Sequence, residues 1–374
     1  MSSRPRFVLS FLAWSSGLSG GDRHLLEAAG RWREHVDVAV LAPPGADETF
    51  GPLIGDVPFR KLGGSGFGAG AALALEYVRR AVEVAARAQE RADVVVAASH
   101  FLPDAAAVAA FGRRGALGVA YVYHLVAQRR DVRVRTLWSK SDERVALALL
   151  RRRAGLVFAS NDATATVLRA RGFAPVRTAV GVDVGSFRPA SLSLRPPRGV
   201  FIGRMAHSKG PTDAVDAWSR VVKDVPEARL TMVGTGPERE RARERARQLG
   251  IGESVEWPGF VSETEKRRIL SESRLLLAPS YEEGWGIAVC EALASSLPVV
   301  AYRLPVLDEL FDSAYLAANV GDVEGIAELA LHVLRDDALA ERLARQGRET
   351  SARYDVGRVA EQELEEIMRR LGSR

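Results

Sequence analysis

The sequence predicts an α/β protein made of two doubly wound domains that face each other across a cleft. Short apolar runs, typical of buried parallel strands, alternate with amphipathic segments along most of the chain. A proline-rich segment, 188–198, interrupts this alternation once, and a second series of strands follows it. A length of 374 residues suits two domains of ordinary size.

Each domain is expected to contain five main strands, and loops that follow strands are where function is expected, because ligands of such sheets bind there. In the first domain the expected strands are 7–14, 36–43, 92–99, 118–126 and 154–160. In the second they are 199–205, 228–236, 254–260, 273–280 and 297–302. Asn161 or Asp162 is expected to cap a helix. The predicted limits are 1–189 for the first domain, 190–198 for a linker, 199–350 for the second domain and 351–374 for a C-terminal helix.

Composition excludes several kinds of site. The single cysteine, Cys290, excludes an internal disulfide and a cysteine-cluster metal site. The six histidines have no close ligand spacing and no Asp-x-Asp is present, so no metal is expected. The net charge of +5 is compatible with anionic substrates, nucleic acid or an acidic membrane face, and selects none of them. The N-terminal apolar run has features of a weak signal peptide, but a buried strand is preferred, so the expected compartment is the cytoplasm.

Two glycine-containing loops are candidate ligand contacts. Gly20 and Gly21 lie between a strand and a helix, where they let backbone approach an anion, although an ordinary turn explains them equally well. The spacing Gly64-x-Gly66-x-x-Ala69 has the outline of a dinucleotide fingerprint. Because it comes late in the domain and its flanking strand is poor, a glycine-rich loop near the cleft is preferred over cofactor binding.

Polar residues follow several of the expected strands. His124 lies at the carboxyl end of 118–126, where a histidine is more often functional than structural, and His100 ends 92–99 in the same way. Arg204 comes just past a strand, and Lys209 lies at the entry of the next helix. Two cations and a helix N-terminus favour an anion-binding site over solvated surface charges.

The segment YEEGWGIAVCEALA places Glu283 in a loop and Glu291 past the first turn of a helix. Paired glycosidase carboxyls flank one bond at roughly 5 to 9.5 Å, whereas these two reach separate points. Separate contacts of the two carboxylates to one long ligand are therefore preferred over a catalytic acid/base pair. Gly284 and Gly286 leave backbone N–H groups accessible at the helix start. These groups form a further candidate anion-binding site. Cys290 is expected to be a small buried side chain.

These motifs together resemble the retaining family-4 glycosyltransferases, whose fold is GT-B, with two Rossmann-like domains. The strongest mark is Glu283-x7-Glu291 within EEGWGIAVCEALASSLPVV, and GRMAHSKGP is similar to the family's phosphate element. GGDRHLLEAAGRW, VGTGPERE and SVEWPGFVSETE also resemble family segments, and the C-terminal helix resembles one that crosses back onto the first domain. The departures, Ser295-Ser296 and Val180, put only local loop contacts in doubt.

The resemblance implies a donor site for a nucleotide diphosphate sugar in the second domain. It implies that Arg204 and Lys209 hold the diphosphate. It also implies that Glu283 binds hydroxyls of the sugar and that Glu291 binds those of the ribose. The remaining implied contacts are Gly20 and Gly21 near the diphosphate, Gly259 and Phe260 near the base, Gly284, Trp285 and Gly286 beside sugar and phosphate, and His124 beside the transferred sugar.

The implied reaction is retaining hexosyl transfer without metal or cofactor, with a UDP-sugar favoured over GDP-mannose. The acceptor stays open among a lipid, a polysaccharide end and a natural product, and no nucleic-acid partner is expected. The basic segment 129–153 carries an apolar stripe of the kind that relatives acting on lipid-linked acceptors use at membranes, but a domain-packing helix is preferred. The alternatives are a nucleotide-sugar-binding protein without turnover and an NAD-dependent oxidoreductase.

Overall fold

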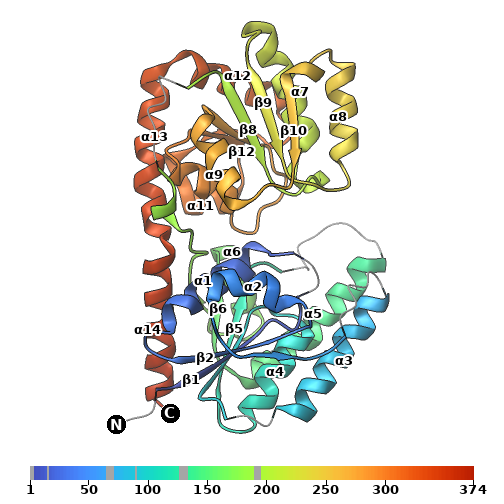
Figure 1. The fold of residues 1–374 in the computed structure, drawn as a ribbon, viewed down its shortest axis with the longest axis vertical. Helices are drawn as coiled ribbons and strands as arrows, with labels where there is room; N and C mark the ends of the chain where they lie inside the picture. Colours follow the sequence, from blue (N-terminus) through green and yellow to red (C-terminus); the bar gives the residue numbers. More distant parts are fainter. Residues whose placement is uncertain (1–3, 15–16, 65–70, 89–90, 126–133, 189–194) are drawn as a thin grey trace. The chain divides into compact units, whose positions relative to one another are not determined.

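The computed structural model forms two compact units, each built on one parallel sheet (Figure 1). It describes residues 4–14, 17–64, 71–88, 91–125, 134–188 and 195–374. Unit 1 comprises Met1–Gly181 and Val356–Arg374, and unit 2 comprises Val182–Asp355. The chain therefore enters unit 2 before the proline-rich segment 188–198 and returns to unit 1 for its last helix.

The sheet of unit 1 has, within the described residues, seven parallel strands in the order β3-β2-β1-β4-β5-β6-β7. These strands are β1 (Arg6–Ser10), β2 (Asp37–Ala42), β3 (Phe59–Lys61), β4 (Val94–Ala97), β5 (Leu117–Val122), β6 (Ala154–Ala159) and β7 (Val176–Arg177). The helices are α1 (Gly20–Trp32), α2 (Ala46–Ile54), α3 (Ala71–Arg87), α4 (Leu102–Gly112), α5 (Val134–Arg153), α6 (Asp162–Ala170) and α14 (Val356–Gly372). Asn161 caps α6 by accepting a hydrogen bond from the backbone N–H of Thr164 at 2.7 Å.

The two faces of this sheet bury separate cores, because successive strand side chains point to opposite sides. Phe7 and Leu9 of β1 belong to a core that includes side chains from α1, α2 and α14. Val8, between them, belongs to the other core, which includes side chains from α3, α4, α5 and α6. Helices therefore cover both faces, as the alternating apolar pattern predicts.

The sheet of unit 2 has, in the described part of the chain, six parallel strands in the order β10-β9-β8-β11-β12-β13. The strands are β8 (Arg198–Ile202), β9 (Arg229–Val233), β10 (Val255–Gly259), β11 (Leu275–Ala278), β12 (Val299–Tyr302) and β13 (Leu316–Ala318). The helices are α7 (Pro211–Asp224), α8 (Arg239–Gln248), α9 (Glu263–Glu272), α10 (Ile287–Ala294), α11 (Pro305–Phe311), α12 (Val323–Arg335) and α13 (Asp337–Ser351). Helix α7 packs against α8 and α12, and α10 packs against α13.

Several predicted strands end earlier than their apolar runs. The run 7–14 stays buried to Trp14, but β1 ends at Ser10 because the Leu12 backbone N–H donates to the Asp104 carboxylate at 2.7 Å instead of to a strand. The run 118–126 was also extended too far, since β5 ends at Val122 and His124 lies in the loop beyond it. The short strands β3, β7 and β13 were missed because two or three residues give too little periodicity.

Three predicted features fall wholly or partly outside the described residues. These are positions 65–70 of the glycine-rich loop, which include Gly66 and Ala69, positions 129–133 of the basic segment and positions 190–194 of the linker. Cys290 is described, and it is fully buried as predicted; burial raises the pKa of its thiol well above the ordinary value.

Candidate functional site

In unit 2 the loops after β8 and β11 lie side by side because these two strands are neighbours at the centre of the sheet. The Ser208 carbonyl accepts hydrogen bonds from the backbone N–H groups of Tyr281 at 2.9 Å and Glu282 at 3.3 Å. Gly210 has a φ of +63°, and a Cβ added there would lie 2.1 Å from the Pro279 carbonyl oxygen. The two loops, 203–210 and 279–286, therefore form one unit that only a glycine at 210 permits.

Lys209 and Glu283 meet where these loops join. The Lys209 Nζ lies 2.6 Å from the Glu283 Oε2, and the Ser280 hydroxyl donates to the Glu283 Oε1 at 2.8 Å. The two side chains are 28% and 12% exposed, so they lie in a partly shielded position that still faces solvent. The structure brings together two residues that the sequence predicts to contact different parts of one donor.

A second group, which the sequence analysis missed, supports the Glu283 loop. The Tyr281 and Tyr302 hydroxyls both donate to the Asp213 Oδ2, at 2.7 and 2.6 Å. Burial, followed by this hydrogen bond, raises the pKa of Tyr281 to about 12. Asp213 lies in the first turn of α7, so these bonds tie the loop to the start of that helix. No local pattern indicated the group, because its members come from three separate elements.

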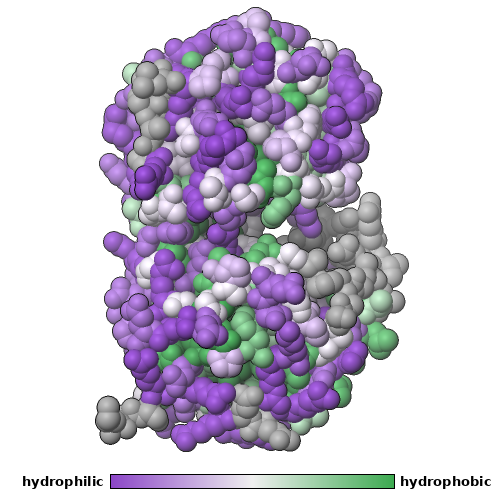
Figure 2. Space-filling view, in the orientation of Figure 1, coloured by the Kyte–Doolittle hydropathy of each residue, from purple (hydrophilic) through white to green (hydrophobic). Residues whose placement is uncertain are grey.

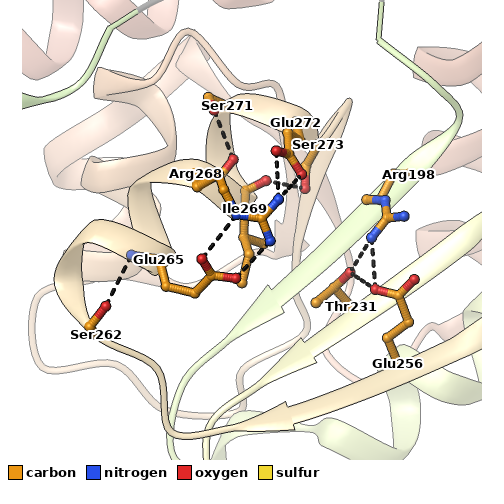
Figure 3. A network of polar contacts seen from close by, with 10 residues as sticks. All are labelled: Arg198, Thr231, Glu256, Ser262, Glu265, Arg268, Ile269, Ser271, Glu272 and Ser273. Carbon is orange, nitrogen blue, oxygen red and sulfur yellow. Dashed lines mark hydrogen bonds and ion pairs between the residues drawn. The ribbon is translucent and has the colours of Figure 1, made fainter.

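Glu291 is held by a different lysine. It lies on α10 with 7% of its side chain exposed, and the Lys266 Nζ is 2.6 Å from its Oε1. Lys266 also lies 3.0 Å from the Glu263 Oε2. Lys266 belongs to α9, whose first turn is capped by the Ser262 hydroxyl, as Figure 3 shows. Glu283 and Glu291 are thus two separately anchored carboxylates, and Lys266 is a candidate site residue that the sequence analysis did not identify.

The other predicted donor contacts have distinct environments. Arg204 is exposed, and no hydrogen bond or ion pair involves its side chain within the described ranges. Phe260 is 86% exposed, and the space beside Gly259, where a side chain would lie, is open. The Trp285 side chain is buried against Phe311 and Tyr354, so only its backbone can face a ligand. Gly284 precedes it in the loop, and Gly286, with a φ of +97°, is the N-cap of α10.

A groove in unit 2 near β10 and α9 has a volume of about 430 Å³. Its charged side chains are paired with one another (Figure 3). Arg268 binds Glu265 and Glu272, and Arg198 binds Glu256 at 2.7 Å. The groove therefore presents charges that are already neutralised.

In unit 1 a pocket of about 250 Å³ lies beyond the carboxyl ends of β1, β4 and β5. Its lining includes His124, His100 and Asp22, together with aromatic side chains from the loops after β1 and β4. The rings of His124 and His100 are 6.3 Å apart, and the His100 Nε2 lies 3.2 Å from the Glu143 Oε2. Both histidines predicted from strand ends therefore line one pocket at the point where the strand order reverses.

The floor of this pocket contains Asp104, which is 1% exposed. Its Oδ1 accepts from the Ser10 hydroxyl and the Leu12 N–H, both at 2.7 Å, and its Oδ2 accepts from the Ser99 hydroxyl at 2.6 Å. Burial raises the pKa of this carboxyl to about 7, although these hydrogen bonds oppose the shift. Asp104 thus joins the ends of β1 and β4 and fixes the shape of the pocket.

Gly20 and Gly21 begin α1, whose N-cap Ser19 forms a capping box with Asp22. A Cβ on Gly21 would lie 2.4 Å from the Tyr123 ring, and the Tyr123 hydroxyl donates to the Gly21 carbonyl at 3.1 Å. Packing against Tyr123 therefore already requires glycine at 21. The approach of these glycines to a diphosphate stays a prediction.

Within the described residues, no group of three or more His, Cys, Asp or Glu side chains is arranged to hold a metal ion. Among the helices that the structure describes, none combines the length and apolar character needed to cross a membrane.

The two parallel-sheet units define the GT-B fold. The structure matches Anabaena HepE in complex with UDP at a TM-score of 0.78, with 18% identity over 97% of this chain and 99% of that one. It matches sucrose-phosphate synthase from Thermosynechococcus elongatus at 0.79, with 17% identity over 99% of this chain and 100% of that one. At these identities the likeness shows the fold.

Sequence comparison relates unit 2 to a family of enzymes. Residues 187–350 match the family model "Glycosyl transferases group 1". The chain is 28% identical to 2-deoxystreptamine N-acetyl-D-glucosaminyltransferase from Niallia circulans, over 38% of each chain. It is 30% identical to phosphatidyl-myo-inositol mannosyltransferase from Mycobacterium leprae, over 56% of this chain and 57% of that protein. The chain thus matches about two fifths to three fifths of these relatives' lengths.

Proposed function

We propose that this protein is a retaining glycosyltransferase that moves a sugar from a nucleotide diphosphate sugar to a hydroxyl acceptor. The observation that carries the proposal is the contact between Lys209 and Glu283 at the carboxyl edge of the unit 2 sheet. This contact lies within the segment that matches the glycosyltransferase family model. Lys209 can bind a diphosphate, and Glu283 can bind sugar hydroxyls. The two side chains are close enough for one donor molecule to contact both.

The donor is bound by separate groups along its length. Lys209 and Arg204 hold the diphosphate, and the N–H groups at the start of α10 contribute to the same anion-binding site. Glu283 accepts hydrogen bonds from the sugar hydroxyls, and Glu291, anchored by Lys266, accepts those of the ribose. Gly259 and Phe260 flank the base. When the diphosphate binds, it replaces Glu283 as the partner of Lys209, and this exchange leaves the carboxylate available to the sugar.

The chemistry follows from charge. Cleavage of the bond between the sugar and the diphosphate moves negative charge onto the leaving phosphate. Fixed cations and helix N–H groups stabilise that charge more in the transition state than in the ground state. The acceptor hydroxyl attacks from the face that the phosphate leaves, and the phosphate oxygen takes the hydroxyl proton. The configuration of the sugar is thereby retained, and no metal ion is required.

A UDP-sugar is the favoured donor, with GDP-mannose as the second choice. The favoured choice is supported by the structural likeness to HepE, which was solved with UDP-glucose. GDP-mannose is retained as the second choice because one of the relatives is a mannosyltransferase. The unit 1 pocket with His124 is proposed to hold the acceptor, whose class stays open among a lipid, a polysaccharide end and a natural product.

A screen of nucleotide sugars for slow hydrolysis without acceptor tests the proposal and identifies the donor. Hydrolysis of one donor is expected, and Lys209→Ala should slow it by a factor on the order of 100 because one contact to the developing charge is lost. Glu283→Ala should abolish turnover while the nucleoside diphosphate still binds, since Lys209 then has no competing carboxylate. Binding of nucleoside diphosphates without hydrolysis or transfer of any sugar would indicate a non-catalytic binding protein. Thermal stabilisation by NAD alone would indicate an oxidoreductase.

A further inference from the structure

The unit 1 pocket gathers aromatic rings beyond the carboxyl ends of its strands. They come from the loops after β1, β4 and β5 and from α3: Phe11, Trp14, Tyr77, Phe101 and Tyr123. The visible surface of unit 1 is, by contrast, mostly hydrophilic, with hydrophobic side chains in small groups (Figure 2). The pocket volume of about 250 Å³ is smaller than the roughly 300 to 1,000 Å³ of sites for drug-sized ligands. The pocket therefore suits one small ring.

Hydrogen bonds to the backbone hold three of these rings in place. The Trp14 indole N–H donates to the Gly17 carbonyl at 2.6 Å, and the Tyr77 hydroxyl donates to the Ala13 carbonyl at 2.6 Å. The Tyr123 hydroxyl also donates to a backbone carbonyl. The polar ends of these side chains are thus engaged, and their rings offer fixed surfaces that attract cations and the C–H groups of a sugar-like ring.

The pocket contains two carboxyl groups, those of Asp22 and Asp104, that have no cationic partner among the described residues. The Asp22 Oδ2 accepts a hydrogen bond from the Ser19 backbone N–H at 3.1 Å. Burial raises the pKa of Asp22, and hydrogen bonds to Ser19 oppose that shift. The three donors to Asp104 are neutral groups as well. The charge of Asp22 adds to the effect of burial on the pKa of Asp104, so the two carboxyls act on one region.

Positive groups beside the pocket are engaged by other acids. Arg80 pairs with Glu76 at 3.0 Å, and its Nη1 donates to two backbone carbonyls. The His100 Nε2 lies 3.2 Å from the Glu143 carboxylate. Among the described residues that line the pocket, none is lysine or arginine. A phosphorylated ring would meet like charge there. A neutral ring would displace water from Asp22 without compensating its charge. A ligand with a positive group meets neither cost.

We propose that the acceptor is a small hydroxylated ring that carries a protonated amine, and that Asp22 binds this ammonium group inside the unit 1 pocket. The inference rests on the proposed function, in which this pocket holds the acceptor, and it names the chemical class of that acceptor. The aromatic rings pack against the ring of the ligand, and the charge-assisted bond to Asp22 orients it. A hydroxyl of the same ring receives the sugar, because a protonated amine has no electron pair with which to attack.

Titrations of the full chain with matched pairs of small rings, followed by ligand-observed NMR, test the proposal. One pair is glucosamine and glucose, and the other is scyllo-inosamine and scyllo-inositol, so each pair differs by one amine in place of one hydroxyl. At a pH where the amine is protonated, at least one amine should bind about fivefold or more tightly than its neutral counterpart, because a charged hydrogen bond replaces a neutral one. N-acetylglucosamine should bind as glucose does, and glucose 6-phosphate should bind more weakly than glucose.

Asp22→Asn locates the amine. It removes the charge but keeps an oxygen that can accept from the Ser19 N–H, so α1 should stay capped, and thermal unfolding checks this. The preference for the amine should be lost in this variant, while the affinity for the neutral ring should stay the same. Glu324→Gln is the matched control, because Glu324 is an exposed acid in the first turn of α12 in unit 2. It should keep the full preference.

Three outcomes would overturn the proposal. One is equal binding of amine and neutral ring in both pairs by the unaltered protein, which needs no variant to fold. Another is tighter binding of glucose 6-phosphate than of glucose. The third is an undiminished amine preference in Asp22→Asn, because the amine would then bind elsewhere. The titrations contain no donor, so their result is independent of the donor hydrolysis that tests the transferase activity.

Discussion

Glu291 needs a positive partner because it is largely removed from water, and Lys266 supplies it at 2.6 Å. An uncompensated buried carboxylate is costly, so Lys266 fixes both the charge and the position of Glu291. The same argument applies to Glu283 with Lys209, except that Lys209 has a ligand-binding role in the proposed function. In the proposed function, Lys266 is therefore an anchor, and Lys209 is a partner that the diphosphate displaces from Glu283.

Lys266→Met should reduce the preference for a nucleoside diphosphate over its 2′-deoxy analogue. Because Glu291 is proposed to grip the ribose hydroxyls, releasing its carboxylate should remove about tenfold or more of that preference. Calorimetric dissociation constants for UDP and 2′-deoxy-UDP measure the ratio. Lys266→Arg should restore the preference. Arg268→Met, on the same helix but bound only to Glu265 and Glu272 among the described residues, is the control and should leave the ratio unchanged. A normal ratio in Lys266→Met would remove Lys266 from the ribose site.

Asp104 should make the stability of the protein fall as pH rises through the acid range. Its folded-state pKa, about 7, lies above the ordinary value of 3.8, so the folded state binds the proton more tightly than the unfolded state does. Its contribution to the free energy of unfolding therefore decreases between about pH 4 and pH 7 and is constant above that. Asp104→Asn cannot titrate. The melting temperature of the original protein relative to this variant should drop across that window, and parallel curves would contradict the assignment.

At the scale of elements, the Glu283 loop is positioned by bonds to two other elements. Backbone groups attach it to the loop after β8, and the Tyr281 and Tyr302 hydroxyls connect it, through Asp213, with α7 and β12. Only Tyr281 belongs to the loop itself, since Tyr302 ends β12. Variants of the two tyrosines can therefore separate an effect on the stability of the protein from an effect on the position of the Glu283 loop.

Tyr281→Phe and Tyr302→Phe should destabilise the protein by similar amounts, about 1.5 to 3 kcal/mol each, because each removes one hydrogen bond to a carboxylate. Only Tyr281→Phe should also lower kcat/KM for the donor severalfold, since it releases the loop that carries Glu283. Tyr315→Phe, which removes a hydroxyl bonded to the Asp308 carboxylate, is the control: it should lower the stability by a similar amount and leave kcat/KM unchanged. Equal losses of kcat/KM in the two tyrosine variants would show that Tyr281 has no special part in positioning the loop.

At the scale of the whole molecule, the last helix completes the first unit. The Trp32 indole N–H donates to the Ala360 carbonyl at 2.8 Å, and the Thr178 hydroxyl donates to the Glu363 Oε1 at 2.6 Å. The Gly181 N–H donates to the His24 Nδ1, so the His24 Nε2 carries the proton and donates to the Glu363 Oε1 at 3.1 Å. Because α14 follows unit 2 in the chain, we expect unit 1 to complete its core only after unit 2 has been synthesised.

A chain that ends at Asp355 should lose the thermal transition of unit 1 and keep that of unit 2. Burial of two α14 side chains, Val359 and Ile367, alone contributes about 3 to 6 kcal/mol, which is comparable to the stability of a whole domain. Scanning calorimetry measures the two transitions. A chain that lacks only Ser373 and Arg374, which lie beyond α14, should melt as the full chain does. Two normal transitions in the shorter chain would show that α14 is dispensable.

The sequence by itself determined the two series of strands, a helix cap at Asn161 or Asp162, the loops that carry Lys209 and Glu283, and the helix that carries Glu291. Apolar periodicity, capping chemistry and motif spacing are local properties, and backbone sterics and burial convert them directly into elements. Tertiary structure alone decided that Lys209 contacts Glu283, that Lys266 anchors Glu291 and that the histidines line one pocket. These pairings join positions far apart in the chain, and the order of strands in each sheet sets which loops become neighbours.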